Sequence, residues 1–198
     1  YDLTSYEVHI FAEITDAPFL SIPDILILAE SYRRDGAEII DIGCLPNQPF
    51  PHLSETIQEL KKNKFYVSVD SHNLEEIVEG SKSGADYVLS LKKENINIIE
   101  SIDATPVLIP NSTDDIDSLY WCIDKCIKEN KKFIADPILD PINYGFTNSL
   151  VRYHQLRKDY PKIDIMMGIG NLTELTHADT TGITAMSVSY THLRAHET

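Results

Sequence analysis

The stretch Ser21–Gly43, SIPDILILAESYRRDGAEIIDIG, predicts one complete helix–strand unit. Ser21 is placed to cap a helix with Pro23 in its first turn, because a serine oxygen accepts a free amide hydrogen and proline tolerates that position. The apolar spacing of a helix follows and ends before Gly36, a residue suited to a helix C-terminus. The β-branched run Glu38–Gly43 then predicts a strand.

The same rhythm repeats along the whole chain, with short apolar runs separated by polar stretches of helical spacing. The eight expected strands are Val8–Ile14, Glu38–Gly43, Phe65–Asp70, Asp86–Leu91, Pro106–Ile109, Phe133–Asp136, Ile163–Ile169 and Ile183–Met186. The expected helices are 21–34, Leu53–Asn63, 73–84, Glu94–Ile99, Asp114–Asn130 and Asn148–Lys158. In the third of these helices, Asn73 and Glu76 suggest a variant of the capping box.

Strands that are apolar along their length and alternate with helices are typical of parallel sheets covered on both faces. Eight such units predict an α/β fold, a (β/α)8 TIM barrel that is truncated at its C-terminus and lacks the last helix. A doubly wound open sheet is the alternative. We expect one domain over residues 1–187, in a fragment, because the chain does not begin with Met.

The final residues 188–198, VSYTHLRAHET, break the rhythm where a last helix is expected. They resemble translated adapter sequence, so we expect a non-native tail. His192, Arg194 and His196 are therefore excluded from the candidate site.

The composition excludes several classes of function. Among 198 residues, 17 basic and 31 acidic side chains give a net charge of −14, which repels nucleic acids and anionic membranes. No apolar run approaches the roughly 20 residues of a membrane span. The odd number of cysteines (Cys44, Cys122 and Cys126) and the lack of an export signal favour the reducing cytoplasm.

Polar side chains occur where the strands are expected to end, which is where functional groups gather in a barrel. Asp41, Asp70 and Asp136 each follow an apolar run. A carboxylate there is costly to desolvate unless it meets donors, and an N–H-rich ring such as an amino-pyrimidinone supplies them. Further candidates at strand ends are Thr15, Asp16, Ser90, Asn111, Gly168 and Asn171.

Each aspartate also has a simpler interpretation. Asp70 suits a helix cap, Asp136 suits a turn before a proline, and Asp41 suits an ion pair with a lysine or arginine. The helical pair Cys122 and Cys126 has a spacing that two metal ligands use, but no third ligand accompanies it at metal-site spacing, so packing is favoured. We therefore identify no metal-ligating residues in the sequence.

Five motifs in order resemble the pterin-binding barrel family of dihydropteroate synthases and methyltetrahydrofolate:corrinoid methyltransferases. The likeness is greatest to the dihydropteroate synthase-related proteins of organisms that use methanopterin-type cofactors. The motifs are DGAEIIDIG (35–43), YVSVDS (66–71), SGADYV (83–88), FIADP (133–137) with YGF (144–146), and MGIGN (167–171). Together they extend the resemblance from residue 8 to about residue 186.

The resemblance implies roles for individual residues. Asp70 and Asp136 match the carboxylates that hold the pyrimidine edge of the pterin. Asn171 falls where the methyltransferases place an asparagine that hydrogen-bonds the pterin ring. Asp41 matches the aspartate of the second-strand motif, and Gly168 opens the turn that shapes the floor of the pocket.

The chain also departs from the family pattern. The loop after the second strand reads CLPNQP (44–49) in place of a Glu-Ser-Thr-Arg-Pro-like loop, and Ser90 stands where an asparagine is usual. No Ser-Arg-Lys follows the seventh strand. Those cations neutralise the pyrophosphate leaving group, so here Mg²⁺ and backbone amides would have to meet its charge.

We therefore expect a dihydropteroate synthase-like transferase that joins a dihydropterin to an arylamine in folate or methanopterin-type cofactor biosynthesis. The alternatives are a methyltransferase that uses a methylated reduced pterin and a corrinoid protein partner, and a non-catalytic pterin-binding domain of a longer protein. The expected partners are the pterin and the arylamine, together with a second copy of the chain in a homodimer.

Overall fold

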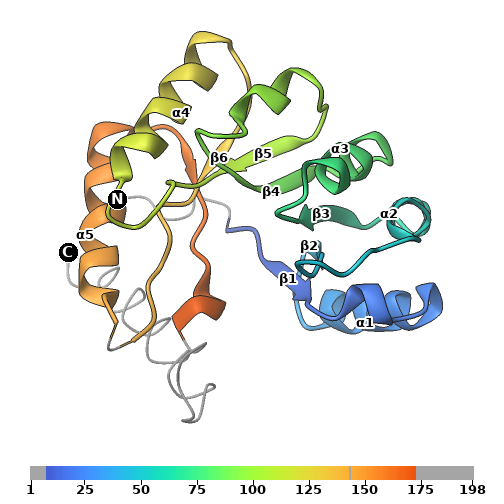
Figure 1. The fold of residues 1–198 in the computed structure, drawn as a ribbon. Coiled ribbons are helices and arrows are strands. Elements are labelled where there is room, and N and C mark those ends of the chain that lie inside the picture. The colour runs from blue at the N-terminus through green and yellow to red at the C-terminus, as the bar shows by residue number, and fades with distance from the viewer. Residues whose placement is uncertain (1–7, 143, 173–198) are drawn as a thin grey trace.

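The computed structural model describes residues 8–142 and 144–172. Within these residues, seven strands form one parallel sheet whose order follows the chain (Figure 1). The strands are β1 (Phe11–Ile14), β2 (Ile39–Gly43), β3 (Tyr66–Asp70), β4 (Tyr87–Leu91), β5 (Thr105–Leu108), β6 (Ile134–Ala135) and β7 (Asp164–Ile165).

Helices lie outside the curved sheet, one unit after another around it (Figure 1). They are α1 (Ile22–Arg34), α2 (Leu53–Lys62), α3 (Leu74–Lys82), α4 (Ile116–Lys128) and α5 (Phe146–Asp159), with short 3₁₀ turns η2 (Ala17–Phe19), η3 (Ile96–Glu100) and η4 (Ile169–Leu172). A doubly wound sheet reverses its strand order, and this sheet does not. The barrel-type α/β architecture is therefore confirmed, while the expected eighth strand Ile183–Met186 and the tail 188–198 lie outside the described residues.

Local sequence signals explain where the helices begin and end. The Ser21 side chain accepts a hydrogen bond from the Asp24 amide at 3.3 Å, and Gly36 follows α1 with a φ of +106°. The Asn73 side chain caps α3 by accepting from the Glu75 amide at 2.9 Å. The expected capping box is wrong in one detail, because the Glu76 carboxylate accepts the Ser71 hydroxyl instead of the Asn73 amide.

The core consists mainly of two groups of buried apolar side chains. One joins β1–β3 to α1 and α2, and the other joins β4–β6 to α3 and α4. β2 is buried along its whole length, as expected of a strand covered on both faces. Cys122 and Cys126 are fully buried in the second group, which confirms packing as their role.

Two of the expected elements differ most from the structure. The expected strand Ile163–Ile169 is only the two residues of β7, because the chain turns at Gly168 and the Asn171 amide donates back to the Gly168 carbonyl at 3.2 Å. The expected helix Glu94–Ile99 is the single 3₁₀ turn η3. No helix in the described part of the chain is long and apolar enough to cross a membrane.

Candidate functional site

Three polar residues lie side by side on neighbouring strands. Glu13 of β1 is in register with Asp41 of β2, and Asp41 is in register with Ser68 of β3. Registered residues of parallel strands point to the same face, and Asp70 shares that face because it lies two residues beyond Ser68. The Ser68 hydroxyl donates to Asp41 Oδ1 at 2.6 Å. Asp41 therefore lies in the middle of β2, not at the end where the sequence had suggested it.

The carboxylates of Glu13, Asp41 and Asp70 form a cluster whose oxygens lie within 4.8 Å of one another. Burial and the charges of Asp70 and Glu13 raise the pKa of Asp41 to about 7, against the opposing effect of the Ser68 hydroxyl. Burial likewise raises the pKa of Asp70. Gly43 makes room for this cluster, because a Cβ there would lie 2.7 Å from Glu13 Oε1.

An irregularity in β4 brings Ser90 to Asp70. The pairing of β4 with β5 shifts between Val88 and Leu91, and Ser90 has a φ of +72°. A side chain in this left-handed region costs about 1–3 kcal/mol and tends to occur at functional sites. Here the Ser90 hydroxyl donates to Asp70 Oδ1 at 3.0 Å, which lowers the pKa of Asp70 against the larger effect of burial. Ser90 thus orients a predicted ligand-binding carboxylate.

Asp136 follows β6 and is 8% exposed. Its Oδ1 accepts two hydrogen bonds, from the Tyr153 hydroxyl of α5 at 2.7 Å and from the Ile138 amide at 2.8 Å. No residue in the described ranges 8–142 and 144–172 donates to its Oδ2. Burial raises the pKa of Asp136, while Tyr153, the Ile138 amide and the Arg152 charge oppose that rise. Asp136 is both a turn residue and a carboxylate with one oxygen left for a ligand.

Arg152 of α5 holds the loop that follows Asp136. Its Nε donates to the Pro137 carbonyl at 3.1 Å, and its Nη2 donates to the Ile138 carbonyl at 2.8 Å. The same Nη2 makes an ion pair with Asp140 Oδ2 at 2.7 Å. The Arg152 side chain is only 13% exposed, so these contacts are largely shielded from water.

The other predicted residues lie in varied surroundings. Asn111, after β5, donates through Nδ2 to Asp115 Oδ2 at 3.3 Å, while its buried Oδ1 has no donor among the described residues. The Asn171 side chain lies against Gly168, where a Cβ would be 3.3 Å from its Nδ2. Thr15 and Asp16 are exposed after β1.

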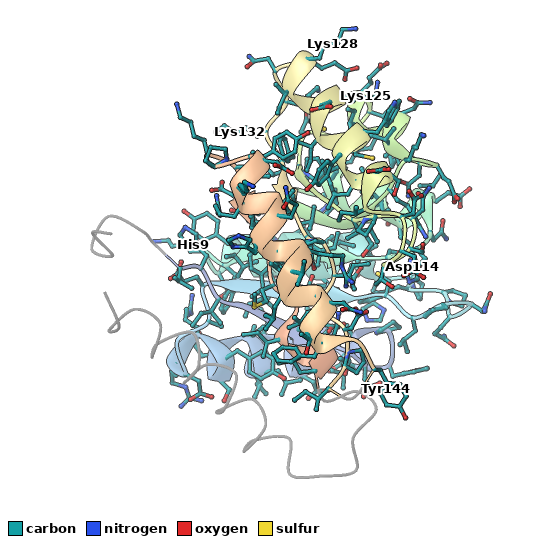
Figure 2. The ribbon with its side chains drawn as sticks, turned by 90° about the vertical axis from the view of Figure 1, so that its left-hand side faces the viewer. His9, Asp114, Lys125, Lys128, Lys132 and Tyr144 are labelled. Atoms are coloured by element: carbon teal, nitrogen blue, oxygen red, sulfur yellow. The ribbon has the colours of Figure 1, made fainter. Side chains whose placement is uncertain are left out.

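All these residues belong to one end of the sheet. Figure 2 shows Asp114 and Tyr144, which come after β5 and β6, on one side of the molecule, and His9 and Lys132, which come before β1 and β6, on the other. The candidate residues other than Asp41 share the side of Asp114 and Tyr144, because they end or follow the parallel strands, and Asp41 joins them through its contact with the Asp70 carboxylate.

The structure brings some of the predicted residues together in two groups at this end, and no described hydrogen bond joins Thr15, Asp16 or Asn111 to either group. Asp41, Asp70 and Ser90 form one group at β2–β4. Asp136 and Gly168 form the other group, because both lie beside the Tyr153 hydroxyl. This hydroxyl donates to Asp136, and the Gly168 amide beside it lowers the pKa of Tyr153 against the larger effect of burial. No hydrogen bond or ion pair joins the two groups within the described part of the chain.

Sequence reasoning missed four residues of the site, namely Glu13, Ser68, Arg152 and Tyr153. Glu13 had a detectable signal, since it is a charged residue in an apolar strand two positions before Thr15. Tyr153 and Arg152 had none, because both lie on an amphipathic helix and only the packing of α5 brings them to Asp136. The simpler interpretation of Asp41 as part of an ion pair is wrong, because its hydrogen-bond partner is Ser68 and no described lysine or arginine pairs with it.

The donor set at β1–β3 fits the Mg²⁺ that the resemblance implies. Glu13, Asp41 and Asp70 offer three carboxylate oxygens within 4.8 Å of one another, and hard oxygen ligands are those that Mg²⁺ prefers. A divalent cation there would also relieve the repulsion among the three charges.

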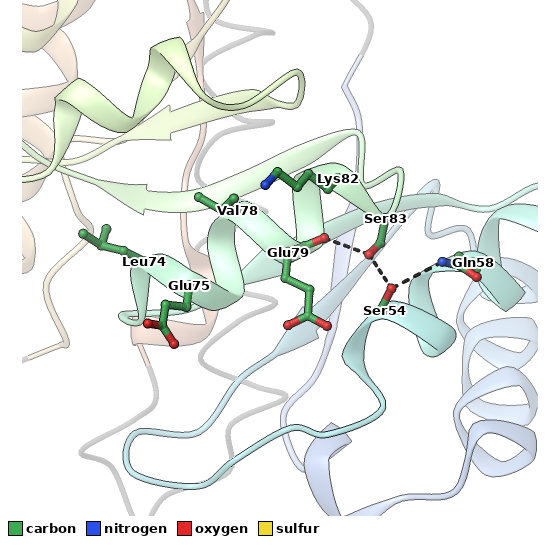
Figure 3. A pocket seen from close by; sticks show the side chains of 8 residues that line it. All are labelled: Ser54, Gln58, Leu74, Glu75, Val78, Glu79, Lys82 and Ser83. Carbon is green, nitrogen blue, oxygen red and sulfur yellow. Dashed lines mark hydrogen bonds between the residues drawn. The ribbon is translucent and has the colours of Figure 1, made fainter.

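A separate hollow of about 590 Å³ lies on the outside of the sheet between α2 and α3 (Figure 3). Leu74 and Val78 supply apolar surface, and the Ser54 and Ser83 hydroxyls bond to each other at 2.7 Å. Because it is formed by the outer helices, this groove is not part of the strand-end site.

The chain is similar in sequence to a curated protein. No family model matches the chain. An uncharacterized protein of Methanocaldococcus jannaschii is 28% identical over 203 aligned positions, which cover 91% of this chain and 38% of that protein. The chain thus spans well under half the length of the curated relative that it matches.

Solved structures of dihydropteroate synthases have the same fold. The Coxiella burnetii enzyme in complex with pteroic acid has a TM-score of 0.71 at 18% identity, over 92% of this chain and 82% of that one. The Yersinia pestis enzyme in a sulfonamide drug complex has a TM-score of 0.70 at 15% identity, over 96% and 84%. The resemblance to the pterin-binding barrels is therefore confirmed at the level of the fold, which is all that identities this low show.

Proposed function

We propose that this chain binds a reduced pterin at the carboxyl ends of its strands and acts as a dihydropteroate synthase-like transferase. Asp70 and Asp136 would hold the pyrimidine edge of the pterin, and Asn171 and Gly168 would line the same site. The reaction would join a dihydropterin to an arylamine in folate or methanopterin-type cofactor biosynthesis.

The observation that carries this proposal is the hydrogen bonding of the Asp70 and Asp136 carboxylates. In both Asp70 and Asp136, Oδ1 accepts a protein hydroxyl, from Ser90 at 3.0 Å and from Tyr153 at 2.7 Å. No described residue donates to either Oδ2. Each carboxylate is thus oriented by the protein and keeps acceptor capacity for an N–H-rich ring, with charge-assisted strength.

The buried Oδ1 of Asn111 supports the same proposal. A buried acceptor without a donor costs about 1–3 kcal/mol, so a ligand N–H group at this end of the sheet would relieve that cost. The altered loop 44–49 is consistent with an amine acceptor other than p-aminobenzoate.

In the proposed reaction, the arylamine nitrogen attacks the methylene carbon of the dihydropterin ester. The new C–N bond forms as the C–O bond breaks, pyrophosphate leaves, and the amine loses a proton. The chain's own residues would contribute mainly by positioning the pterin ring. Mg²⁺ held by Glu13, Asp41 and Asp70 would supply positive charge near the leaving group.

The acidic cluster also favours a second candidate function. Three carboxylates within 4.8 Å are a poor environment for a pyrophosphate ester without a cation. A methylated reduced pterin carries no such group, so methyl transfer to a corrinoid protein suits this charge distribution. Pyrophosphate release with an arylamine distinguishes the first function, and methyl transfer to cobalamin distinguishes the second.

Binding should be tested first, by fluorescence titration with 6-hydroxymethyl-7,8-dihydropterin. Asp136→Asn and Asp70→Asn should each weaken binding about ten- to a hundredfold, because each removes a charge-assisted hydrogen bond. Asp114→Asn is the matched control, since Asp114 is an exposed aspartate at the same end of the sheet (Figure 2). A folded wild type that does not bind the pterin would refute the proposal.

Three further expectations belong to the same proposal. One is a closed eight-stranded barrel over residues 1–187, followed by a non-native tail over 188–198. Another is a non-catalytic role, to be concluded if the pterin binds tightly without turnover of either kind. The last is a cytoplasmic homodimer.

A further inference from the structure

The loop between β6 and α5 contains an unusual backbone conformation next to Asp136. Ile138 has a φ of +64°, in the left-handed region that β-branched side chains rarely adopt. The strained residue is the one whose amide donates to Asp136 Oδ1 at 2.8 Å. If Ile138 relaxed to a negative φ, its amide would turn away from the carboxylate. Something must therefore hold Ile138 in place.

The Arg152 guanidinium makes the contacts that do so. Its Nε bonds the Pro137 carbonyl at 3.1 Å and its Nη2 bonds the Ile138 carbonyl at 2.8 Å, so one planar fork fixes the peptide groups on both sides of Ile138. Lysine has no such fork, because its ammonium is a single point of charge.

The far end of the loop is held by the first turn of α5. Asp140 makes an ion pair with Arg152, and its Oδ2 also accepts a hydrogen bond from the Ser149 hydroxyl at 3.0 Å. The Asp140 amide donates to the same Ser149 oxygen at 2.7 Å. Gly145 allows this close approach, because a Cβ there would lie 3.0 Å from Asp140 Oδ2. Arg152 is therefore itself held by Asp140 and Ser149, both of which its Nη2 contacts, while it bonds the two carbonyls.

We propose that Arg152 is a positioning residue for the pterin site: it locks Ile138 in its left-handed conformation, so that Asp136 presents Oδ2 to the ligand while Oδ1 is occupied by protein donors. This inference rests on the proposed function in assigning the ligand to Asp136. It assigns a specific role to a residue that touches neither the ligand nor the reacting atoms.

The charges around Asp136 predict how Arg152 affects the pH dependence of pterin binding. Asp136 faces the Tyr153 hydroxyl and the Arg152 guanidinium from α5 and the Ile138 amide from its own loop, while Asp140 pairs with Arg152. Arg152 lowers the pKa of Asp136 against the effect of burial, so removing the guanidinium raises that pKa further. Protonation of Asp136 weakens charge-assisted binding, so the acid limb of the binding profile should move to higher pH.

The test titrates 6-hydroxymethyl-7,8-dihydropterin into the wild type, Arg152→Met and Arg152→Lys across a range of pH. We expect Arg152→Met to bind about tenfold more weakly, with its acid limb displaced to higher pH, and Arg152→Lys to lie between it and the wild type. Arg33→Met is the matched control. Arg33 also pairs with a carboxylate, Glu30, and donates to the Asn63 carbonyl at 3.2 Å, but it lies on α1. The Arg33→Met variant should bind the pterin with the affinity of the wild type.

A rescue experiment separates positioning from a general loss of structure. Glycine adopts a positive φ without strain, so Ile138→Gly removes the need for a residue that enforces it. We expect the Arg152→Met, Ile138→Gly double variant to regain a large part of the affinity that Arg152→Met loses. A loss caused only by damaged packing would not be recovered by removing a further side chain.

A measurement without ligand keeps this inference separate from the proposed function. Hydrogen exchange of the Ile138 amide should accelerate in Arg152→Met, because its bond to Asp136 would open more often. Unchanged exchange would overturn the positioning role. So would pterin binding by Arg152→Met within about twofold of the wild type while Asp136→Asn weakens binding about tenfold or more. If Arg152→Met fails to fold, the same readouts on Arg152→Lys decide. If exchange accelerates but the wild type binds no pterin, the proposed function fails and the role of Arg152 in holding the loop stands.

Discussion

Asp41 and Asp136 are both buried aspartates of one parallel sheet, but their neighbours carry opposite charges. Asp41 is 5% exposed and lies beside the carboxylates of Asp70 and Glu13, with the Ser68 hydroxyl as its hydrogen-bond donor. Asp136 is 8% exposed and lies beside the donors of Tyr153, Ile138 and the charge of Arg152. Burial raises the pKa of both residues, but neighbouring charges add to the rise at Asp41 and oppose it at Asp136.

The difference shows two ways of preparing a carboxylate for a ligand. Around Asp136 the protein supplies the donors and fixes the geometry in advance, and the Arg152 charge favours the ionised carboxylate against the effect of burial. Around Asp41 the like charges are left to repel, so the cluster is most stable when a proton, a cation or a donor-rich ligand is bound.

The largest effect should come from removing the charge of Asp41. Its pKa rises from 3.8 to about 7 on folding, so the folded state binds more protons than the unfolded state between these pH values. The contribution of Asp41 to the free energy of unfolding is therefore fully present below pH 3.8. About 4 kcal/mol of it is lost as the pH rises through 7. Asp41→Asn cannot ionise and should raise the free energy of unfolding at pH 8 by up to about 4 kcal/mol.

Urea denaturation in EDTA at pH 4 and pH 8 measures this effect. The advantage of the Asn variant should be present at pH 8 and absent at pH 4. Asp114→Asn serves as control, since an exposed aspartate should change stability little at either pH. A variant that is less stable than the wild type at both pH values would contradict the repulsion described here.

At Asp136 we expect a smaller change in the free energy of unfolding, and a loss of stability in place of a gain. Tyr153→Phe deletes the hydroxyl that donates to Asp136 Oδ1 at 2.7 Å and leaves the carboxylate with one donor fewer in a buried site. Losing a hydrogen bond to a charged group costs about 1.5–3 kcal/mol, so the free energy of unfolding at pH 8 should fall by that amount.

Tyr160→Phe is the matched control for this change. Its hydroxyl also donates to an aspartate, Asp124, at 2.8 Å, but the pair is exposed. Its loss should cost less than about 1 kcal/mol, because water replaces the lost hydrogen bond. Equal costs for the two tyrosines would mean that Asp136 does not depend on Tyr153 as its burial suggests.

The sequence predicts the repeated units well, because each one is encoded locally. Ser21 and Gly36 bound α1 as expected, and the strands with continuous apolar runs were located to within a few residues. The short strands β6 and β7 were predicted too long, since Gly168 and the turn at Asp136 end their pairing sooner than hydrophobicity alone suggests.

The candidate site was predicted only as far as strand ends could reveal it. Asp70 and Asp136 follow apolar runs, so their position at the edge of the sheet was predictable. Ser68 and Glu13 reach Asp41 through strand register, which is a property of pairing between strands and not of any one segment. Arg152 acts through the packing of a helix, which leaves no local pattern in the sequence.

The smallest expected change in stability concerns Ser90, whose hydroxyl donates to Asp70 and whose backbone is strained. Ser90→Ala removes the hydroxyl that bonds Asp70 at 3.0 Å and keeps a Cβ at a φ of +72°, so we expect a loss of about 1 kcal/mol. Ser90→Gly removes the same hydroxyl but releases the left-handed strain, which offsets about 1 kcal/mol and should leave the stability near that of the wild type. Urea denaturation of both variants measures the difference. If glycine is no more stable than alanine at this position, the φ of Ser90 carries no strain, and the irregularity of β4 needs another cause.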